Sequence, residues 1–219
     1  MNKNFHLSVL VFILAFTAQN TFSQAYKKGT LMIGISEGST KANYTTSDIH
    51  TNQLVKHKCG DGVRDPFVIE YGISNKWSLG LCAGNDIFKV NVADFYGGPT
   101  LTNQAKVTTS EFTFDANYHF FVNKRLDLSA FTSLGGFSIK IASNESDIYY
   151  KHVANGNIIR IGIRARYYFW NRLGAFGMIS NYAAKCSPKD VKGNSFGQNY
   201  STSISGFAIE TGLCFKIIK

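Results

Sequence analysis

One polar dipeptide recurs at a fixed interval along the chain, and this interval constrains the fold more than any other feature of the sequence. Asn75-Lys76, Asn123-Lys124 and Asn171-Arg172 follow one another at steps of 48 residues, each between two apolar, aromatic-rich runs. One further step back reaches Lys27, and one further step forward reaches Lys219, the last residue. Asn tolerates the backbone conformations of tight turns. The sequence therefore predicts four consecutive units of one length, joined by three tight polar turns.

The runs on either side of each turn alternate with period 2 between apolar residues and small or polar ones. Before the third turn, Ile159, Ile161 and Ile163 fall on one face, and Arg160 and Arg164 fall on the other. Such alternation is typical of β-strands whose two faces meet different environments. The first two turns are flanked in the same way, so each unit is expected to contain two strands. Eight strands of about 10 residues with this alternation match a membrane-spanning β-barrel.

The two faces differ in bulk as well as in polarity. One carries aromatic and branched apolar residues, and the other carries Gly, Ser, Thr and charged residues. Small residues suit the narrow, filled interior of an eight-stranded barrel, whereas the bulky face would overfill it. The pattern therefore predicts an all-β protein, an eight-stranded antiparallel up-and-down transmembrane β-barrel with its apolar face toward lipid. The alternation slips by one residue near Gly135 and Gly136, which predicts a β-bulge there. A soluble barrel or sandwich, with the apolar face inward, is the alternative.

The N-terminus has the form of a secretory signal peptide. Lys3 gives a positive start, residues 7–16 are almost unbroken apolar, and small residues follow at Ser23 and Ala25. The apolar run of about 10 residues is short of the roughly 20 that a spanning helix needs. We therefore expect residues 1–25 to be a cleaved signal and residues 26–219 to form an exported barrel domain. No Cys lies at the junction, so a lipid-anchored start is not expected.

Aromatic residues and connection lengths indicate how the barrel would lie in a membrane. Aromatics cluster beside the three short turns, as in the interfacial girdles of outer-membrane barrels. Long polar segments near residues 44–65, 89–106, 143–156 and 186–201 connect the opposite ends of the strands. Short periplasmic turns and longer extracellular loops are the usual arrangement. The turns are thus predicted to be periplasmic and the four long segments to be extracellular loops. The expected girdle consists of Trp77, Tyr118, Phe120, Tyr167, Phe169 and Trp170.

These features together resemble those of small outer-membrane β-barrel proteins typified by the OmpA transmembrane domain and OmpX. The resemblance covers residues 26–219 and rests on the signal peptide, the eight alternating strands, the turn–loop asymmetry and the aromatic run Tyr167-Tyr168-Phe169-Trp170. It implies location in the cell outer membrane, contact with outer-membrane lipid and lipopolysaccharide, and insertion by the barrel-assembly machinery. Such barrels usually end on an aromatic residue, whereas here Phe215 is followed by four further residues.

Charged residues fall on the face that is predicted to line the lumen. Buried charges must be paired and hydrogen-bonded, and side chains nearly fill an eight-stranded lumen. A structural ion-pair network that closes the lumen is therefore expected. The arginines of the sixth strand should find partners on neighbouring strands, and the acids of the fourth and eighth are the candidates. A narrow, gated path for ions or small solutes is the alternative. The network is predicted to contain Glu70, Glu111, Asp115, His119, Arg160, Arg164, Arg166, Glu210 and Lys216.

The sequence shows no motif for an enzyme, a metal or a cofactor. No nucleophile elbow, metal-ligand spacing or phosphate-binding glycine loop is present. His119 alone is a strand histidine with acidic neighbours on its face, which is more often a structural position than a catalytic one. We therefore predict no enzymatic activity, no cofactor and no metal. The net charge of +9 forms no basic stripe, so nucleic-acid binding is not predicted either.

Four cysteines occur in the chain. Cys82 and Cys214 fall on the polar face of separate strands, where small residues pack well. Cys59 and Cys186 fall in the first and last predicted loops, which barrel closure would bring together. A Cys59–Cys186 disulfide is therefore predicted.

Two classes of function fit this reading. The first, which the sequence favours, is a non-enzymatic outer-membrane barrel with a structural role, or with a recognition role through loops that meet an unknown extracellular partner. The second is a narrow gated channel, or porin, for small solutes or ions. A soluble ligand-binding β-barrel is a third and weaker reading.

Overall fold

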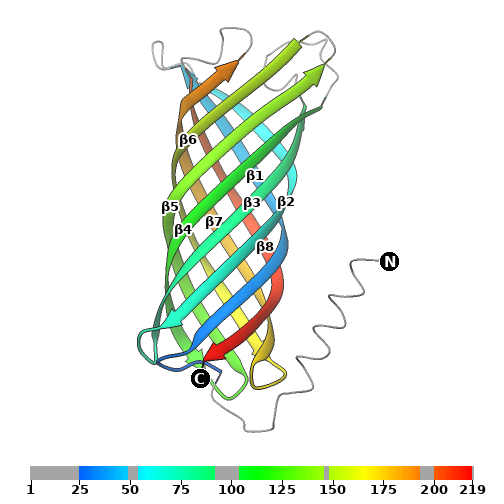
Figure 1. Ribbon diagram of the computed structural model, residues 1–219. Coiled ribbons are helices and arrows are strands. Elements are labelled where there is room, and N and C mark those ends of the chain that lie inside the picture. Colours follow the sequence, from blue (N-terminus) through cyan, green and yellow to red (C-terminus); the bar gives the residue numbers. More distant parts are fainter. Residues whose placement is uncertain (1–24, 49–53, 92–103, 146–147, 193–199, 219) are drawn as a thin grey trace, which may run out of the picture.

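The computed structural model describes residues 25–48, 54–91, 104–145, 148–192 and 200–218, which form one closed barrel of antiparallel strands (Figure 1). Each strand pairs with the next along the chain, and β8 pairs with β1 to close the barrel. The predicted fold is therefore confirmed, whereas the predicted signal peptide lies almost wholly outside the described residues. The strands are β1 Leu31–Asp48, β2 Leu54–Gly72, β3 Trp77–Asn91, β4 Gln104–Val122, β5 Leu126–Glu145, β6 Ile148–Tyr168, β7 Leu173–Lys192 and β8 Tyr200–Ile218.

Within the part of the chain that the structure describes, no helix is long and apolar enough to cross a membrane.

The strands are much longer than the sequence pattern predicted. They contain from 15 to 21 residues, whereas about 10 were expected. Most residues of the four predicted loops belong to strands instead. For example, β2 already begins at Leu54, and β6 begins at Ile148. Of those predicted loops, residues 49–53, 92–103, 146–147 and 193–199 lie outside the described residues. The prediction of four long loops was therefore wrong for the segments that continue the barrel wall.

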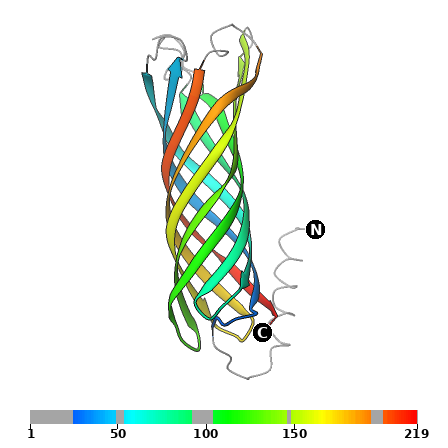
Figure 2. The same ribbon diagram turned by 90° about the vertical axis from the view of Figure 1, so that its left-hand side faces the viewer.

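The barrel has two halves with opposite polarity. In the lower half, next to the three turns, the outer face is apolar and carries exposed residues such as Ile35, Phe114 and Ile161. In the upper half the outer face is mostly polar: Lys41 and Asn157 are exposed there, and Val63 and Ile87 are exposed apolar residues among the polar ones. Both views show the strands running without a break through the two halves (Figures 1 and 2). We define the lower half as the wall from the turns up to Ile35, Phe67, Ala83, Phe112, Leu134, Ile159, Ile179 and Phe207, and call its apolar outer face the apolar belt.

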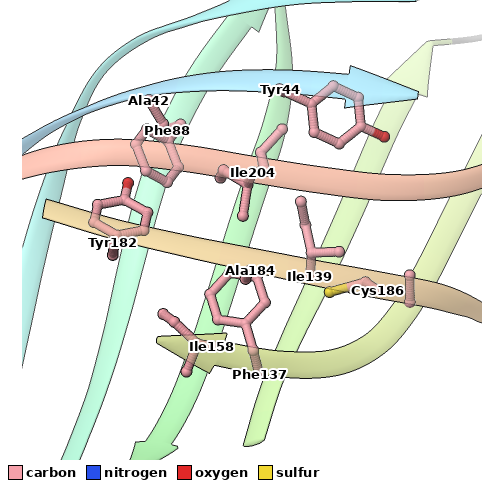
Figure 3. Close-up of a cluster of buried hydrophobic side chains, with 12 residues drawn as sticks. Ala42, Tyr44, Phe88, Phe137, Ile139, Ile158, Tyr182, Ala184, Cys186 and Ile204 are labelled. Atoms are coloured by element: carbon pink, nitrogen blue, oxygen red, sulfur yellow. The ribbon is translucent and has the colours of Figure 1, made fainter. Parts of the chain in front are cut away.

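The lumen of the upper half is filled by apolar side chains. Phe88, Ile139 and Ile204 are among the members of this cluster, and all are almost fully buried (Figure 3). Because its inward residues are apolar and its outward residues polar, the upper half is patterned like a soluble barrel. This inversion explains why the extended strands resembled loops in the sequence. The cluster consists of Ala42, Tyr44, Phe88, Val107, Phe137, Ile139, Ala154, Ile158, Tyr182, Ala184, Cys186 and Ile204.

The β-bulge predicted near Gly135 and Gly136 is not there. The β5 register runs without a shift through both residues on each of its two sides, and the shift between β4 and β5 falls between His119 and Phe121. Phe137 keeps the inward parity of the residues before it. The apparent slip in the sequence marks the change from a polar to an apolar lumen.

Glycines on the inner wall make room for aromatic rings in this narrow lumen. A Cβ at Gly62 would lie 2.5 Å from the ring of Phe88, and one at Gly162 would lie 2.7 Å from the ring of Phe131. The inward glycines therefore set how closely the aromatic side chains can approach the wall, as expected for an eight-stranded barrel.

Candidate functional site: the charged lumen

The first group of buried charges is centred on Arg64 of β2. Its Nη1 lies 2.9 Å from Asp86 and its Nε lies 2.9 Å from Glu210, while its Nη2 bonds to Glu111. Arg160 of β6 shares two of these acids, at 2.8 Å from Glu111 and 4.0 Å from Glu210. We call these five residues the Arg64 cluster. They join strands β2, β3, β4, β6 and β8 across the lumen.

A second group lies nearer the turns and is centred on Glu70. Arg164 Nη1 is 3.0 Å from Glu70, and Arg166 bonds to Glu70 and lies 2.8 Å from Asp127. His119 is wedged between the same acids, with Nδ1 at 2.7 Å from Asp127 and Nε2 at 3.3 Å from Glu70. We call these five residues the Glu70 cluster. It joins β2, β4, β5 and β6.

Both clusters lie inside the barrel with almost no solvent contact. Every charged member has a relative exposure of 6% or less. In such surroundings a single charge is strongly unfavourable, and the cost is offset only by close pairing and further hydrogen bonds. Four guanidinium groups here face five carboxylates, so the charges nearly cancel. Removal of one member of either cluster would therefore leave a buried charge without its partner. Together the two clusters bridge opposite walls of the lumen.

Two members of the predicted network stand apart from the clusters. Asp115 faces the lumen and accepts a hydrogen bond from Thr113 at 3.0 Å, but no cation of the described residues forms a salt bridge with it. Lys216 is also buried, and its Nζ lies 3.4 Å from the carbonyl oxygen of Ala25 and 4.0 Å from the centre of the Tyr168 ring. The structure thus places both residues in the lumen, while their contacts differ from those of the two clusters.

Sequence reasoning missed three charged residues that the clusters require. Arg64 fell within a predicted loop, and Asp86 and Asp127 were not selected. All three have the parity of inward residues on their strands, as Arg64 shares the face of Glu70. Extending the period-2 alternation from Glu70 toward the N-terminus, beyond the predicted start of the strand, would have placed Arg64 on the inner face. The outer face beyond that point alternates Asp65, Val63 and Asp61 instead of a run of apolar residues, which hid the signal.

The predicted salt-bridge partners of the three β6 arginines were right for Arg160 only. Arg160 pairs with acids of β4 and β8, as predicted. Arg164 and Arg166 pair instead with Glu70 of β2 and, for Arg166, Asp127 of β5. These guanidinium groups reach across the lumen or to the adjacent strand, and the sequence contains no measure of that reach.

The chain that precedes β1 runs across the lower end of the barrel (Figure 2). We call residues 25–30 the N-terminal strap. The Ala25 amide donates to the carbonyl of Asn123 at 2.9 Å, and the Gly29 amide donates to that of Gly72 at 2.8 Å. Gly29 has a φ of 83°, which glycine adopts without strain. The strap is therefore bonded to two different edges of the mouth.

Tyr26 of the strap is the residue that enters the lumen. Its ring stacks on the imidazole of His119 with centroids 3.5 Å apart, and its hydroxyl donates to the carbonyl of Trp77 at 2.6 Å. Burial raises the pKa of the Tyr26 hydroxyl, which keeps this hydroxyl protonated and able to donate. Tyr26 thus covers the Glu70 cluster on the side of the turns.

One chain of side-chain contacts has the arrangement of a nucleophile, a base and an orienting acid: Ser78, His119 and Asp127. Ser78 Oγ lies 3.0 Å from His119 Nε2, and His119 Nδ1 lies 2.7 Å from Asp127. However, the Ser78 hydroxyl donates to Glu70 at 2.8 Å, and all three side chains are buried beneath Tyr26. Catalysis would require space for a substrate beside the nucleophile. The contacts instead describe a continuous polar network.

No group of three His, Cys, Asp or Glu side chains among the described residues could hold a metal ion.

The predicted girdle residues lie on the outer wall beside the turns. Trp77, Phe120, Tyr167, Phe169 and Trp170 are exposed, and Tyr118 is half-buried against Trp77 with ring centroids 4.9 Å apart. The structure brings them to the lower rim, and their role as an interfacial girdle stays a prediction.

The predicted turn residues do form the tight connections. At the second turn, the Asn123 amide oxygen accepts from the backbone N–H groups of Arg125 at 2.8 Å and Leu126 at 2.7 Å. Asn75 accepts from the backbone N–H of Lys28 in the strap at 3.0 Å. The Asn side chain therefore bonds to nearby backbone, which is a second reason for its use in turns. Lys76, Lys124 and Arg172 are exposed at this rim, with Asn171 half-buried beside them.

The predicted disulfide is not formed. Cys186 is a free thiol that faces the upper lumen within the apolar cluster, and the side chain of Cys59 lies outside the described residues. Cys186 is on β7 and Cys59 on β2, and strands β8 and β1 separate them. The prediction was wrong because it treated both residues as parts of neighbouring loops, whereas they belong to the barrel wall. Cys82 and Cys214 are also free and buried, as their parity indicated.

Comparison with known proteins gives a likeness in fold. No protein-family model and no curated protein matches the chain. Among solved structures, outer membrane protein AlkL in lipid bilayers matches at 12% identity and a TM-score of 0.53, covering 92% of this chain and 96% of that one. The outer membrane protein OprG from Pseudomonas aeruginosa matches at 13% identity and a TM-score of 0.52, covering 88% and 98%. At these identities the likeness shows the fold alone: the chain has the fold of the small outer-membrane β-barrels.

Proposed function

We propose that this protein is an integral outer-membrane β-barrel without enzymatic activity, which anchors itself through its lower half and presents its upper half for recognition at the cell surface. The observation that carries the proposal is the inversion of polarity along one continuous wall. The lower half is apolar outside and holds buried charges beside a smaller apolar group inside, whereas the upper half is mostly polar outside and mostly apolar inside. A single solvent does not favour both patterns.

The lower half fits a bilayer. Soluble proteins rarely expose contiguous apolar patches larger than a few hundred Å². Here the belt runs round all eight strands, and Phe114 is 67% exposed at its centre. Hydrocarbon contact satisfies such a surface, while barrel closure satisfies the backbone hydrogen bonds. A soluble ligand-binding barrel does not account for the belt.

The lumen of the lower half is closed in this account. The Arg64 cluster bridges the walls above, the Glu70 cluster bridges them below, and Tyr26 of the strap covers the lower mouth. The apolar cluster fills the upper lumen. In this proposal, the described side chains of these layers leave water and ions no continuous path. The proposed role is therefore anchoring and display, and the turns face the periplasm, where the barrel-assembly machinery would meet the chain.

Recognition belongs to the upper half because that part stands clear of the belt in water. It carries a rigid polar wall and the connections at its rim, and an extracellular partner would meet these first.

The proposal predicts which residues are accessible on intact cells. In a Cys59→Ser background, Asn155→Cys on the upper wall should react with a membrane-impermeant maleimide on intact cells. Asn75→Cys at a turn should react only after the outer membrane is permeabilised. Labelling of both residues in the soluble fraction, without heat-modifiable migration, would overturn the proposal.

A narrow channel is the second candidate, and one observation favours it. Buried lumen atoms without a hydrogen-bond partner in the described part of the chain include Asn117 Nδ2 and the Nε of Arg160, Arg164 and Arg166. All are donors, and water molecules threading the lumen would satisfy them. Single-channel recording in planar bilayers separates the two candidates. The closed-lumen proposal predicts no resolvable openings, and openings that are lost with Arg164→Ala would establish the channel.

A further inference from the structure

Both ring nitrogens of His119 on β4 lie beside hydrogen-bond acceptors. Nδ1 is 2.7 Å from Asp127 of β5, and Nε2 is 3.3 Å from Glu70 of β2 and 3.0 Å from the hydroxyl oxygen of Ser78. Because the Ser78 hydroxyl donates its proton to Glu70, its oxygen accepts a bond from Nε2 and has no second proton to donate. Only the doubly protonated imidazolium carries an N–H group on each nitrogen. The contacts therefore assign a positive charge to His119.

The charges buried in the lumen agree with this assignment. The described residues bury six carboxylates, but they bury only four guanidinium groups and one ammonium group, so one positive charge is missing. An imidazolium at His119 supplies that charge, and buried charges must be compensated. The acids are Glu70, Asp86, Glu111, Asp115, Asp127 and Glu210, and the bases are Arg64, Arg160, Arg164, Arg166 and Lys216.

The other charged groups around the imidazole are engaged elsewhere. Arg166 of β6 bonds to Asp127 at 2.8 Å and to Glu70 at 3.2 Å, so it shares both acids with His119. Lys216 of β8 lies 3.4 Å from the carbonyl oxygen of Ala25, on the side of the strap. Neither group replaces the N–H groups that His119 directs at the two acids.

Tyr26 of the N-terminal strap covers this imidazolium directly. The two rings are parallel to within 9° at a centroid separation of 3.5 Å, which places a cation against an aromatic face. Gly72 makes the room, because a Cβ there would lie 2.9 Å from the Tyr26 hydroxyl and 2.7 Å from the carbonyl oxygen of Lys27. The wall is thus shaped to receive the strap, and the charge of His119 strengthens its docking.

We propose that the strap is a pH-dependent closure of the lower mouth, docked while His119 is an imidazolium and released when that proton is lost. Loss of the proton turns a lone pair of Nε2 toward Glu70 and removes the cation beneath the Tyr26 ring. It also leaves one buried carboxylate uncompensated, which water must then solvate. Water reaches the Glu70 cluster through the mouth that the strap covers. Release is therefore expected as pH rises, and acidification should restore docking.

Release of the strap opens the mouth without opening a channel. The Arg64 cluster and the apolar cluster lie above the Glu70 cluster, and neither contacts the strap. The change is thus confined to the lower end of the barrel. That this end faces the periplasm rests on the proposed function, whereas the link between His119 and the strap does not.

Distances between spin labels on the strap and on the opposite rim test the proposal. The labels are placed at Lys28→Cys and Arg172→Cys in otherwise cysteine-free full chain, inserted in phosphatidylcholine vesicles. Lys28 is bonded to the turn between β2 and β3, and Arg172 lies in the turn four strands away, on the other side of the mouth. Pulsed electron paramagnetic resonance should give one narrow distance distribution at about pH 6 and a broad one at about pH 10, a range that spans the ordinary titration of histidine.

Three variants identify the group that titrates. His119→Asn keeps every other histidine of the chain but takes up no proton, so its distance distribution should be the same at both pH values. Tyr26→Leu removes the ring and should give the broad distribution already at the lower pH. Lys216→Gln removes a second titratable cation near the strap and should keep the change of the wild type. Burial raises the pKa of the Tyr26 hydroxyl, which therefore stays neutral throughout.

A measurement on the wild type needs no substitution in the lumen. Nitrogen NMR at neutral pH should show both ring nitrogens of His119 protonated, and one unprotonated nitrogen would contradict the proposal. A wild-type distribution that stays narrow at both pH values would also contradict it, as would an unchanged pH response in His119→Asn. Loss of the response in Lys216→Gln would assign it to the lysine instead. Failure of the wild type to insert in the vesicles, seen as missing heat-modifiable migration, contradicts the proposed function and is distinct from these results.

Discussion

The two halves of the barrel are built from the same eight strands but are stabilised by different interactions. The lower half has an apolar outer face around the Glu70 cluster and a smaller apolar group that includes Phe131 and Phe176, and the Arg64 cluster lies at its upper boundary. The upper half has a polar outer face around an apolar cluster that includes Phe88 and Ile204. Strand alternation alone fixes which residues share a face, and the surrounding solvent decides which face is apolar. The comparison predicts where along the wall that solvent changes.

The charged lumen of the lower half follows from this difference. The outer face places its apolar side chains toward lipid, and the narrow interior holds charges beside a smaller apolar group that includes Phe131 and Phe176, so those charges must neutralise one another there. In the upper half water solvates the outside, and hydrophobic burial becomes available to the lumen. The two kinds of interior should therefore respond differently to substitution.

The largest expected effect is the loss of a central lumen charge in the lower half. Glu70→Ala leaves Arg164 and Arg166 without their shared carboxylate, which should lower the free energy of unfolding by about 3–5 kcal/mol. Glu37→Ala removes an exposed acid from the outer wall of the upper half and should change it by less than about 0.5 kcal/mol. Urea unfolding in lipid vesicles, followed by heat-modifiable migration, measures both. Similar values for the two variants would contradict the assigned clusters.

The next effect is that of a charge on the outer wall. Ile161→Arg places a cation in the middle of the belt, where it should cost about 2–4 kcal/mol. Asn157→Arg lies four residues higher on the same strand, outside the belt, and should cost less than about 1 kcal/mol. The comparison uses the same unfolding measurement. A soluble barrel would tolerate Arg equally well at both positions, because both side chains are exposed.

A smaller effect is expected from the core of the upper half. Ile204→Val removes one methylene from a fully packed apolar cluster and should lower stability by about 0.5–1.5 kcal/mol. The loss should be the same at low and high salt, because no charge is involved. Stability of the wild type and of this variant is measured by urea unfolding at both ionic strengths. A strong dependence of the difference on salt would show that the upper lumen is not the apolar cluster described.

The smallest expected effect is on the rate at which the Cys186 thiol reacts with maleimide. Burial raises the pKa of the Cys186 thiol to about 11, so little of it is thiolate at neutral pH. In folded protein Cys186 should react with maleimide far more slowly than in urea, as measured by mass spectrometry of the peptide. Rapid labelling of the folded barrel, or a disulfide at this residue, would show that the upper lumen is open.

The sequence predicted the lower half well and the upper half poorly. Period-2 alternation with bulky apolar residues outside located every turn and the inward positions of Glu70, Arg160 and Arg164. Beyond the belt the alternation continues with apolar residues inside, and without a hydrophobic outer face the segments were assigned to loops. Arg64 was lost for that reason. The pairing of acids and bases across the lumen could not be predicted, because it depends on barrel closure and on side-chain reach.

The central claim is that the outer wall leaves the membrane at one level while the strands continue. Single spin labels placed along β6 test it most directly, at positions 155, 157, 161, 163 and 165 of otherwise cysteine-free protein in lipid vesicles. Accessibility of each label to oxygen, which concentrates in hydrocarbon, is compared with accessibility to a water-soluble nickel chelate. The account predicts oxygen-dominated accessibility at 161, 163 and 165, and chelate-dominated accessibility at 155 and 157. Chelate-dominated values at all five positions, or oxygen-dominated values that extend through 155, would contradict it.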